Sequence, residues 1–256
     1  LNTLIGGLAG DALTSGNSNV AIGYQALTAD TLGDRNIAIG NGALATQNFT
    51  TTTDAYNIAI GQEAGYSVTT GIKNTLVGGL AGDAIGDADF NVAMGYLALS
   101  TNTVGSSSVA IGTSALQNQN PATAASMLNV AVGHDAGAAV TTGAANTFVG
   151  GRAGDGTDDG TNNTAMGYLA LSANCGNDNT AIGKSSLQVA TGGGNVAVGK
   201  DAGLSLTSGT LNVLIGGLAG DALTDADENV AVGYQALSAD TLGLKSTALG
   251  NEALAT

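Results

Sequence analysis

The sequence has little of what most folded domains use to fill a core. It contains no tryptophan, three phenylalanines and one proline in 256 residues. Charged residues make up 10 % of the chain, where about a quarter is usual. A thick core of large side chains is therefore excluded, whereas the 41 glycines permit a thin core in which backbone layers approach closely. Disorder is disfavoured, because Val, Ile and Leu recur throughout and mean hydropathy is positive.

Basic residues are also scarce. Six Lys+Arg against 20 Asp+Glu give a formal net charge of -14, which disfavours nucleic acid and anionic membrane surfaces as partners. A single cysteine, Cys175, excludes an intrachain disulfide. No apolar run reaches the ~18 residues of a membrane span. The N-terminal LNTLIGGLAGDAL recurs nearly unchanged at 211–223 and so is no signal peptide; we expect a segment of a longer protein, with any secretion signal or anchor outside it.

What the sequence has instead is one short unit repeated fifteen times. The unit reads Asn-φ-Ala-φ-Gly-x-x-Ala-(Leu/Gly), where φ is aliphatic or Thr, and its positions are numbered from Asn as position 1. Position 4 is always large and aliphatic, position 5 is always Gly, and position 8 is Ala in every copy except at Ser186. The copies begin at Asn2, Asn19, Asn36, Asn57, Asn74, Asn91, Ser108, Asn129, Asn146, Asn163, Asn179, Asn195, Asn212, Asn229 and Ser246.

Four kinds of unit alternate in a fixed order. The first type reads NTLIGGLAGD, the second NVAIGYQAL, the third NIAIGNGAL and the fourth NIAIGQEAG. Most copies are 16 or 17 residues apart, two are 21 apart, and the block of four repeats after 72 and later 66 residues. This higher period indicates duplication of a four-unit block.

The repeat predicts an all-β fold. Asn-Val-Ala-Ile alternates with the period of two of a strand, and a glycine in every unit disfavours helix. A coil of this length suits two short strands and two turns, so we predict a parallel β-solenoid, or β-roll, of about fifteen turns that forms one domain over residues 1–256. The Asn column is predicted to form a hydrogen-bonded ladder. The position-5 glycines are predicted to be structural corners that need positive φ or close backbone approach. They are Gly6, Gly23, Gly40, Gly61, Gly78, Gly95, Gly112, Gly133, Gly150, Gly167, Gly183, Gly199, Gly216, Gly233 and Gly250.

The two faces of the predicted strand differ in size. We expect Val and Ile to fill the interior and the Ala side to face outward, where the first-type units place bulkier residues. An outward apolar stripe usually meets a partner, and identical chains meet it symmetrically in a closed ring. We therefore expect self-association, with three chains as the expected number. The bulkier residues are Leu4, Leu76, Phe148 and Leu214.

The units NVAIGYQAL, NIAIGNGAL and SVAIGTSAL resemble the head repeats of trimeric autotransporter adhesins of the YadA type. Similar repeats occur in phage tail fibres and bacterial surface filaments. The resemblance covers the whole chain and implies a left-handed parallel β-roll, a homotrimer, and an adhesive or spacer role outside the cell, on a cell surface or a virion fibre. The coils are longer than is usual in that family, and no neck, stalk or anchor is present, so a tail-fibre shaft and a self-stacking filament subunit stay as alternatives.

Tyrosines follow the corner glycine of every second-type unit and form a row: Tyr24, Tyr96, Tyr168 and Tyr234. Such a row suits stacking on the sugars of a cell-surface glycan. The structural alternative, which we favour, is a half-buried ring that packs over the glycine corner with its hydroxyl in water.

The two 21-residue units carry insertions, 47–56 and 117–128, which are predicted to leave the solenoid as lobes. Loops on a rigid scaffold are where binding tends to reside, so Phe49 and Tyr56 are candidate contacts for a glycan or matrix protein. Neutral drift of a tolerated insertion explains them equally well.

The loops after the first-type units are acidic and contain weak calcium candidates. Ca²⁺ prefers several oxygen ligands. A calcium loop starting at Asp155 lacks its acidic twelfth residue, where Met166 stands, so solvated turns are favoured and no cofactor is expected. The candidates are Asp87, Asp89, Asp155, Asp159, Asp225 and Asp227.

No catalytic constellation is evident in the sequence. His134 shares a repeat column with Gln62 and Lys200, which predicts a surface residue, and it has no second His or Cys for a zinc site. Cys175 has no His nearby in sequence for a nucleophilic pair. The acidic residues at position 7, such as Glu63, recur in one column, unlike the single carboxylate pair of a glycosidase. We expect a protein without enzymatic activity.

Overall fold

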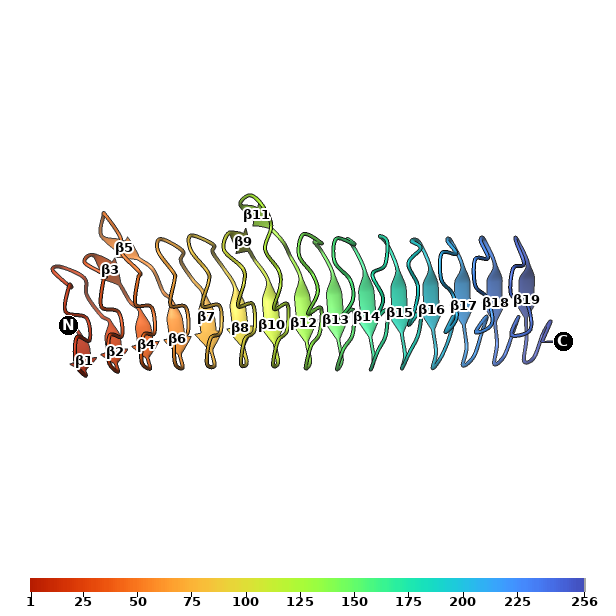
Figure 1. Ribbon diagram of the computed structural model, residues 1–256, viewed down its shortest axis with the longest axis horizontal. Coiled ribbons are helices and arrows are strands. Elements are labelled where there is room, and N and C mark those ends of the chain that lie inside the picture. Colours follow the sequence, from red (N-terminus) through yellow and green to blue (C-terminus); the bar gives the residue numbers. More distant parts are fainter. Residues whose placement is uncertain (256) are drawn as a thin grey trace. The chain divides into compact units, whose positions relative to one another are not determined.

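The computed structural model describes residues 1–255 as β-strands and turns, and none of these residues lies in a helix. The chain divides into two compact units, Leu1–Asn129 and Val130–Thr256. Each unit is a parallel β-solenoid in which every turn contributes one three-residue strand at positions 2–4 (Figure 1). The predicted all-β solenoid of about fifteen turns is confirmed.

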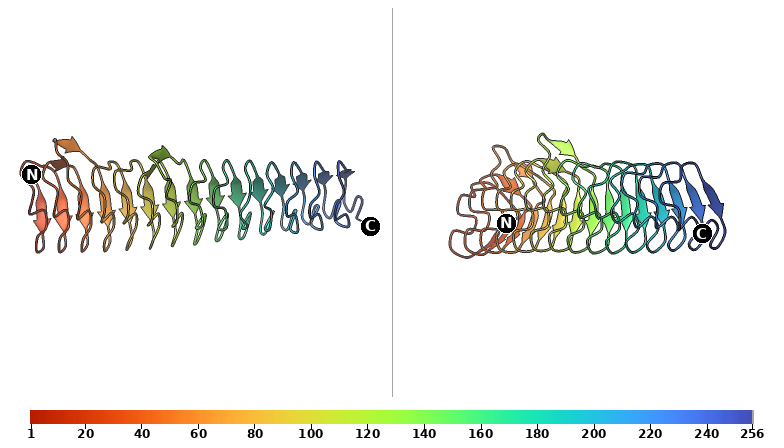
Figure 2. Two further views of the ribbon diagram at one scale, coloured as in Figure 1. Left: turned by 45° about the horizontal axis from the view of Figure 1, so that its top comes forward. Right: turned by 45° about the vertical axis from the view of Figure 1, so that its right-hand side comes forward.

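The strands of each unit lie side by side in chain order, as both views of Figure 2 show. Equal repeat positions are in register, so that Val20 lies beside Ile37 and Ala21 beside Ala38. The first unit contains β1 (Thr3–Ile5), β2 (Val20–Ile22), β4 (Ile37–Ile39), β6 (Ile58–Ile60), β7 (Thr75–Val77), β8 (Val92–Met94) and β10 (Val109–Ile111). The second contains β12 (Val130–Val132), β13 (Thr147–Val149), β14 (Thr164–Met166), β15 (Thr180–Ile182), β16 (Val196–Val198), β17 (Val213–Ile215), β18 (Val230–Val232) and β19 (Thr247–Leu249).

The return side of most coils has no strand, and the expectation of two strands per coil is wrong. Positions 7 and 9 have φ near +55° in every turn, as Gln25 (57°) and Leu27 (53°) show. The residue before Asn has the same left-handed conformation, for example Ser18 at 60°. Left-handed residues curl the backbone, so this side cannot extend. Such φ values are uncommon for residues other than Gly and cost conformational energy.

The corner glycines behave as predicted. Their φ values lie between +124° and +142°, a region that residues with a Cβ rarely adopt. Stacking of the turns adds a second constraint: a Cβ on Gly78 would lie 2.6 Å from the carbonyl oxygen of Gly95 in the next turn. Both reasons for glycine apply together.

The orientation of the strands corrects the expected faces. Positions 1 and 3 point inward, and position 3 is buried at Leu76, Phe148 and Leu214 as well as at the alanines; only Leu4, in the first turn, is exposed. Val and Ile at positions 2 and 4 point outward, and Ile60 is 38 % exposed. Each strand thus encloses Asn and one further residue, usually Ala, and leaves the two residues at positions 2 and 4 outside.

The four-unit period follows from how this narrow interior is filled. Second- and third-type turns place Ala at position 3 and a buried Leu at position 9, such as Leu99. First-type turns reverse the sizes, with Leu76 at position 3 and Gly82 at position 9. A Cβ on Gly82 would lie 2.8 Å from Cδ2 of Leu76, so the two positions share one space. In the fourth type, Gly65 makes room for the same Leu76 from the turn before.

The Asn ladder is confirmed and couples the turns through the backbone. The backbone N–H of Asn91 donates to Oδ1 of Asn74 at 2.9 Å, and the N–H of Asn74 donates to Oδ1 of Asn57 at the same distance. Nδ2 of Asn74 donates to the carbonyl of Ala88 across the coil. Asn74 therefore joins neighbouring turns and both sides of its own turn, whereas Nδ2 of Asn163 has no hydrogen-bond partner among the described residues.

Both insertions form short parallel strand pairs that stand out from the other loops (Figure 1). In the first, β5 (Thr53–Asp54) pairs with β3 (Gly33–Asp34) of the turn before. In the second, β11 (Ala125–Ser126) pairs with β9 (Gly105–Ser106). The predicted lobes are thus ordered extensions of the coil.

Candidate functional site

The outward sheet face of each unit is apolar along its whole length. Positions 2 and 4 hold only Val, Ile, Thr, Met and Leu in all fifteen units. Several of these side chains are well exposed, among them Ile60, Met94 and Ile182 at 38 to 41 %. Parallel sheets in proteins normally have both faces covered. The predicted apolar outward stripe exists, but it lies on the Val and Ile face rather than on the Ala face.

The four tyrosines have nearly the same environment in their four turns. They are 50 to 54 % exposed. Each ring lies over the position-6 glycine of the turn before: a Cβ on Gly7 would be 3.4 Å from Tyr24, and one on Gly79 would be 3.6 Å from Tyr96. The half-buried ring over a glycine is confirmed, although this glycine is the one after the corner. Half of each ring stays accessible.

The first insertion presents one of its two predicted contacts. Phe49 is buried at 5 % exposure, so its prediction as a binding residue is wrong; it anchors the insertion instead. Tyr56 is half-exposed, and the Arg35 guanidinium lies 5.5 Å from its ring centroid. Arg35 also forms an ion pair with Asp54 in β5. The insertion therefore meets the preceding turn through Arg35.

The residues that precede Asn form a further column, which was not predicted from the sequence. Besides Arg35 and Tyr56 it contains Lys73, whose ammonium lies 5.2 Å from the centroid of Phe90 in the next turn. Cations and rings thus alternate over four successive turns of the first unit. The signal was present as a repeat column, but its residues share no type and so show no pattern.

The calcium candidates act as turn residues. Asp225 accepts hydrogen bonds from the hydroxyls of Thr207 (2.6 Å) and Ser208 (2.8 Å), which lower its pKa. Asp227 accepts from the N–H of Thr210, and Asp155 forms an ion pair with Arg152.

The remaining candidates fit the same description. Asp89 accepts from the N–H of Ile72 in the preceding turn. Asp87 and Asp159 are exposed. Within residues 1–255 no group of three or more His, Cys, Asp or Glu is placed to hold a metal.

Two carboxyl groups at position 10 of first-type turns were not singled out in the sequence. Burial raises the pKa of Asp83 and Asp221, and the neighbouring carboxylates of Glu63 and Asp201 raise it further. Oδ1 of each is buried and has no hydrogen-bond partner in the described part of the chain. In the equivalent turn, Arg152 pairs with Oδ2 of Asp155, while Oδ1 of Asp155 likewise has no hydrogen-bond partner.

The lone histidine and cysteine do not meet. His134 is exposed, as predicted, with Nδ1 3.0 Å from the carboxylate of Asp135. Cys175 is buried beside the hydroxyl of Thr157 at 3.3 Å, and burial raises the pKa of its thiol. A thiol of raised pKa is a poor nucleophile.

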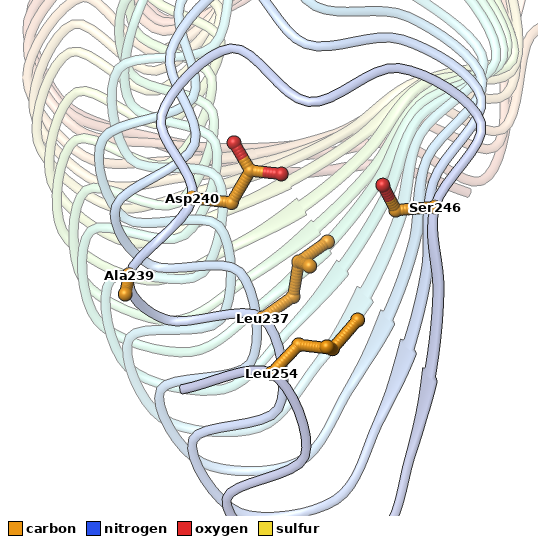
Figure 3. Close-up of a pocket in the computed structure, with 5 residues that line it drawn as sticks. All are labelled: Leu237, Ala239, Asp240, Ser246 and Leu254. Carbon is orange, nitrogen blue, oxygen red and sulfur yellow. The ribbon is translucent and has the colours of Figure 1, made fainter. Parts of the chain in front are cut away.

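A cavity of about 270 Å³ lies in the last turn of the second unit. Figure 3 shows Leu237 and Leu254 pointing into it, with Ser246 on the strand side and Asp240 above. These residues occupy positions 1, 9 and 12, which elsewhere fill the interior. The cavity is therefore a section of the core rather than a built site.

Comparison with known proteins adds no family to these observations. No family model matches the chain, and no curated protein matches it. None of the described residues forms a helix long and apolar enough to cross a membrane.

Proposed function

We propose that the chain is a structural rod segment of an extracellular fibre, a homotrimer assembled through the outward sheet face. The observation that carries this proposal is that face: a parallel sheet whose outward positions hold only aliphatic residues and Thr in every turn. Such a face in water is unfavourable, and burying it against copies of itself removes the cost. The resemblance to YadA-type head repeats supports three chains around an axis.

The distribution of charge favours a second copy over an unlike partner. None of the 26 charged residues occupies positions 2 or 4, although the chain has a net charge of -14. Acidic residues lie outside the outward sheet face, so identical faces meet without opposing charges. The predicted absence of enzymatic activity belongs to the same proposal, since a repeated surface presents no single reactive centre.

Oligomeric state and face-directed variants test the assembly. We expect light scattering of the chain at micromolar concentration to give the mass of a trimer. Ile60→Glu combined with Met94→Glu places charge on the face and is expected to give monomers. Gln62→Glu adds charge to an exposed residue outside the face and is the matched control. A monomeric wild-type chain, or variants that all stay trimeric, would contradict the assembly.

Attachment or spacing at a cell or virion surface is the role we propose for this rod. Support comes from the repeat resemblance and from the repeated tyrosines and lobes, which offer recurring contacts along a scaffold. Immunogold labelling of producing cells and purified phage particles tests the location. Label on neither surface, with antigen confined to the cell interior, would overturn it. Label on particles alone would select the tail-fibre shaft among the alternatives.

A further inference from the structure

The side chains at repeat position 6, here called the position-6 column, follow the four-unit block. Position 6 is Gly in the first type, Tyr in the second and polar in the third and fourth. In the first unit one complete set is Gly7, Tyr24, Asn41 and Gln62. The second unit has the set Gly151, Tyr168, Lys184 and Lys200. Each unit contains two position-6 tyrosines four turns apart, a distance of roughly 19 Å at the spacing of stacked strands.

The column is accessible and largely unpaired. The tyrosines and the polar side chains of both sets are exposed. Within the described part of the chain, the side chains of Asn41, Gln62 and Lys184 have no hydrogen bond or ion pair, whereas Lys200 pairs with Asp201 at 3.1 Å. The column follows the corner glycine and therefore lies beyond the sheet face proposed to assemble. Trimer formation through positions 2 and 4 leaves it available.

Glycine at position 6 of the preceding turn leaves room for each tyrosine ring to pack against the backbone. The Cβ of any other residue at Gly151 would lie 3.7 Å from Cδ2 of Tyr168, and a longer side chain would displace the ring. The rings are thus held against the backbone on one side while the other side faces solvent. A rigid, half-exposed ring followed by amide or amine groups at roughly 5 Å intervals is an ordered set of contacts.

We propose that the position-6 column binds a linear polysaccharide lying along the turns, which rests on the adhesive role proposed above. The C–H face of a sugar ring packs on tyrosine, and amides and ammonium groups donate to sugar hydroxyls. A repeated aromatic and polar pattern without an apolar pocket fits a repetitive, hydroxyl-rich polymer better than a folded protein epitope. Lys184 and Lys200 beside Tyr168 select carboxylated sugars in the second unit.

Several equivalent sites on one chain give the binding a multivalent signature. Removing one tyrosine leaves the others engaged, so Tyr24→Ala alone lowers affinity only several-fold. Removing all four tyrosines abolishes avidity, which is expected to weaken binding by about 10²-fold or more. Tyr66→Ala is the matched control, because Tyr66 is 44 % exposed but lies at position 10, outside the column.

The experiment measures binding of the whole chain to immobilised cello-oligosaccharide, chitin oligomer, xylan, hyaluronan and alginate by interferometry. We expect the wild type and Tyr66→Ala to bind at least one polymer equally. The variant that lacks all four position-6 tyrosines is expected not to bind that polymer. Lys184→Ala with Lys200→Ala is expected to reduce binding of hyaluronan or alginate but not of neutral polymers.

Binding of no polymer in the panel, or equal binding of the four-tyrosine variant, would overturn the proposal. Tyrosine-dependent binding of immobilised collagen in place of every glycan would overturn it too. Light scattering and circular dichroism of each protein are recorded in parallel. If the four-tyrosine variant does not fold, the four single variants, each weakened several-fold, replace it. A trimer that binds no glycan refutes this inference and leaves the rod standing, whereas a monomer that binds glycan refutes only the rod.

Discussion

At the corner of each first-type turn, two neighbouring glycines have different reasons to be glycine. Gly78 at position 5 has φ of +136° and stacks on the backbone of the next turn. Gly79 at position 6 has no positive φ and only faces the ring of Tyr96. Glycine at position 5 is required by the backbone conformation, whereas glycine at position 6 leaves room for a side chain on the surface.

This difference predicts contrasting effects of the same substitution. Gly78→Ala places a Cβ 2.6 Å from the Gly95 carbonyl in a strained conformation, and we expect a loss of about 3 kcal/mol in the free energy of unfolding. Gly79→Ala places its Cβ at an ordinary 3.6 Å from Tyr96 and is expected to be nearly neutral. Urea denaturation measures both. Equal losses would show that the corner has no special requirement.

Electrostatics at position 10 predict a pH-dependent stability. Because burial raises the pKa of Asp83 above its ordinary 3.8, the folded chain holds this proton more tightly than the unfolded chain. Stability therefore falls as pH rises from about the unfolded value through the raised folded pKa. Leu80→Arg copies the Arg152–Asp155 pair, at the same left-handed φ, and lowers the pKa of Asp83.

We expect Leu80→Arg to raise the melting temperature by roughly 1 to 2 °C at neutral pH and to lose this gain in acid, measured by calorimetry. Leu97→Arg is the control, because it has the same backbone conformation but Ser100 in place of the carboxylate. The same gain in both variants would assign the effect to the arginine side chain rather than to the pair.

Among single residues, those that recur at one repeat position had a role that could be predicted from the sequence. The corner glycines, the Asn ladder and the tyrosine row recur at fixed spacing, and each was found. The buried Oδ1 of Asp83 was not predicted, because Asp recurs at position 10 of all four first-type units and the sequence does not show that Asp11 is exposed there while Asp83 is half-buried. Phe49 was misjudged because an insertion has no repeat column against which its burial can be judged.

The coil as an element shows two ways to fill one interior. In one, position 3 is Ala and a Leu at position 9 fills the space, as in Ala93 and Leu99. In the other, a Leu at position 3 fills the same space and position 9 is Gly, as in Leu76 and Gly82. The four-unit block is therefore a packing pattern as well as a record of duplication.

A double mutant in the first unit tests whether a turn with Leu at position 3 and Gly at position 9 can be converted into one with Ala and Leu. Leu76→Ala leaves a cavity and is expected to cost about 3 kcal/mol. Gly82→Leu alone clashes with Leu76, although its φ of +57° is the one that Leu99 already adopts. The double mutant has the residues of a second-type turn, so it should recover more than half of the free energy of unfolding that the two single mutants lose in sum. Chemical denaturation measures all three variants. Simple additivity of the two losses would show that the positions do not share a space.

The strand element was predictable, but its orientation was not. Period-two alternation shows which residues share a face, and register then follows from the repeat. Which face points inward depends on the width of the coil. That width is set by left-handed residues at positions 7 and 9, many of them Leu or Gln, which carry no sequence signal for that conformation.

For the whole molecule, the sequence indicates one stacked architecture and a negative net charge. The predicted trimer brings together three chains of net charge -14 through faces that carry none. Apolar burial favours this assembly, while repulsion among the acidic turns opposes it. The repulsion acts over the Debye length, about 30 Å at 0.01 M salt and about 10 Å at 0.1 M.

Added NaCl is therefore expected to strengthen the trimer, with a several-fold lower dissociation constant when ionic strength rises from about 0.01 to about 0.1 M. Sedimentation across a dilution series measures this constant. CaCl₂ at matched ionic strength is the control: an effect equal to that of NaCl is screening alone, and a larger one assigns a structural role to acidic turns such as those holding Asp225 and Asp227. A trimer weakened by salt would mean that ion pairs, rather than the aliphatic sheet face, hold the chains together.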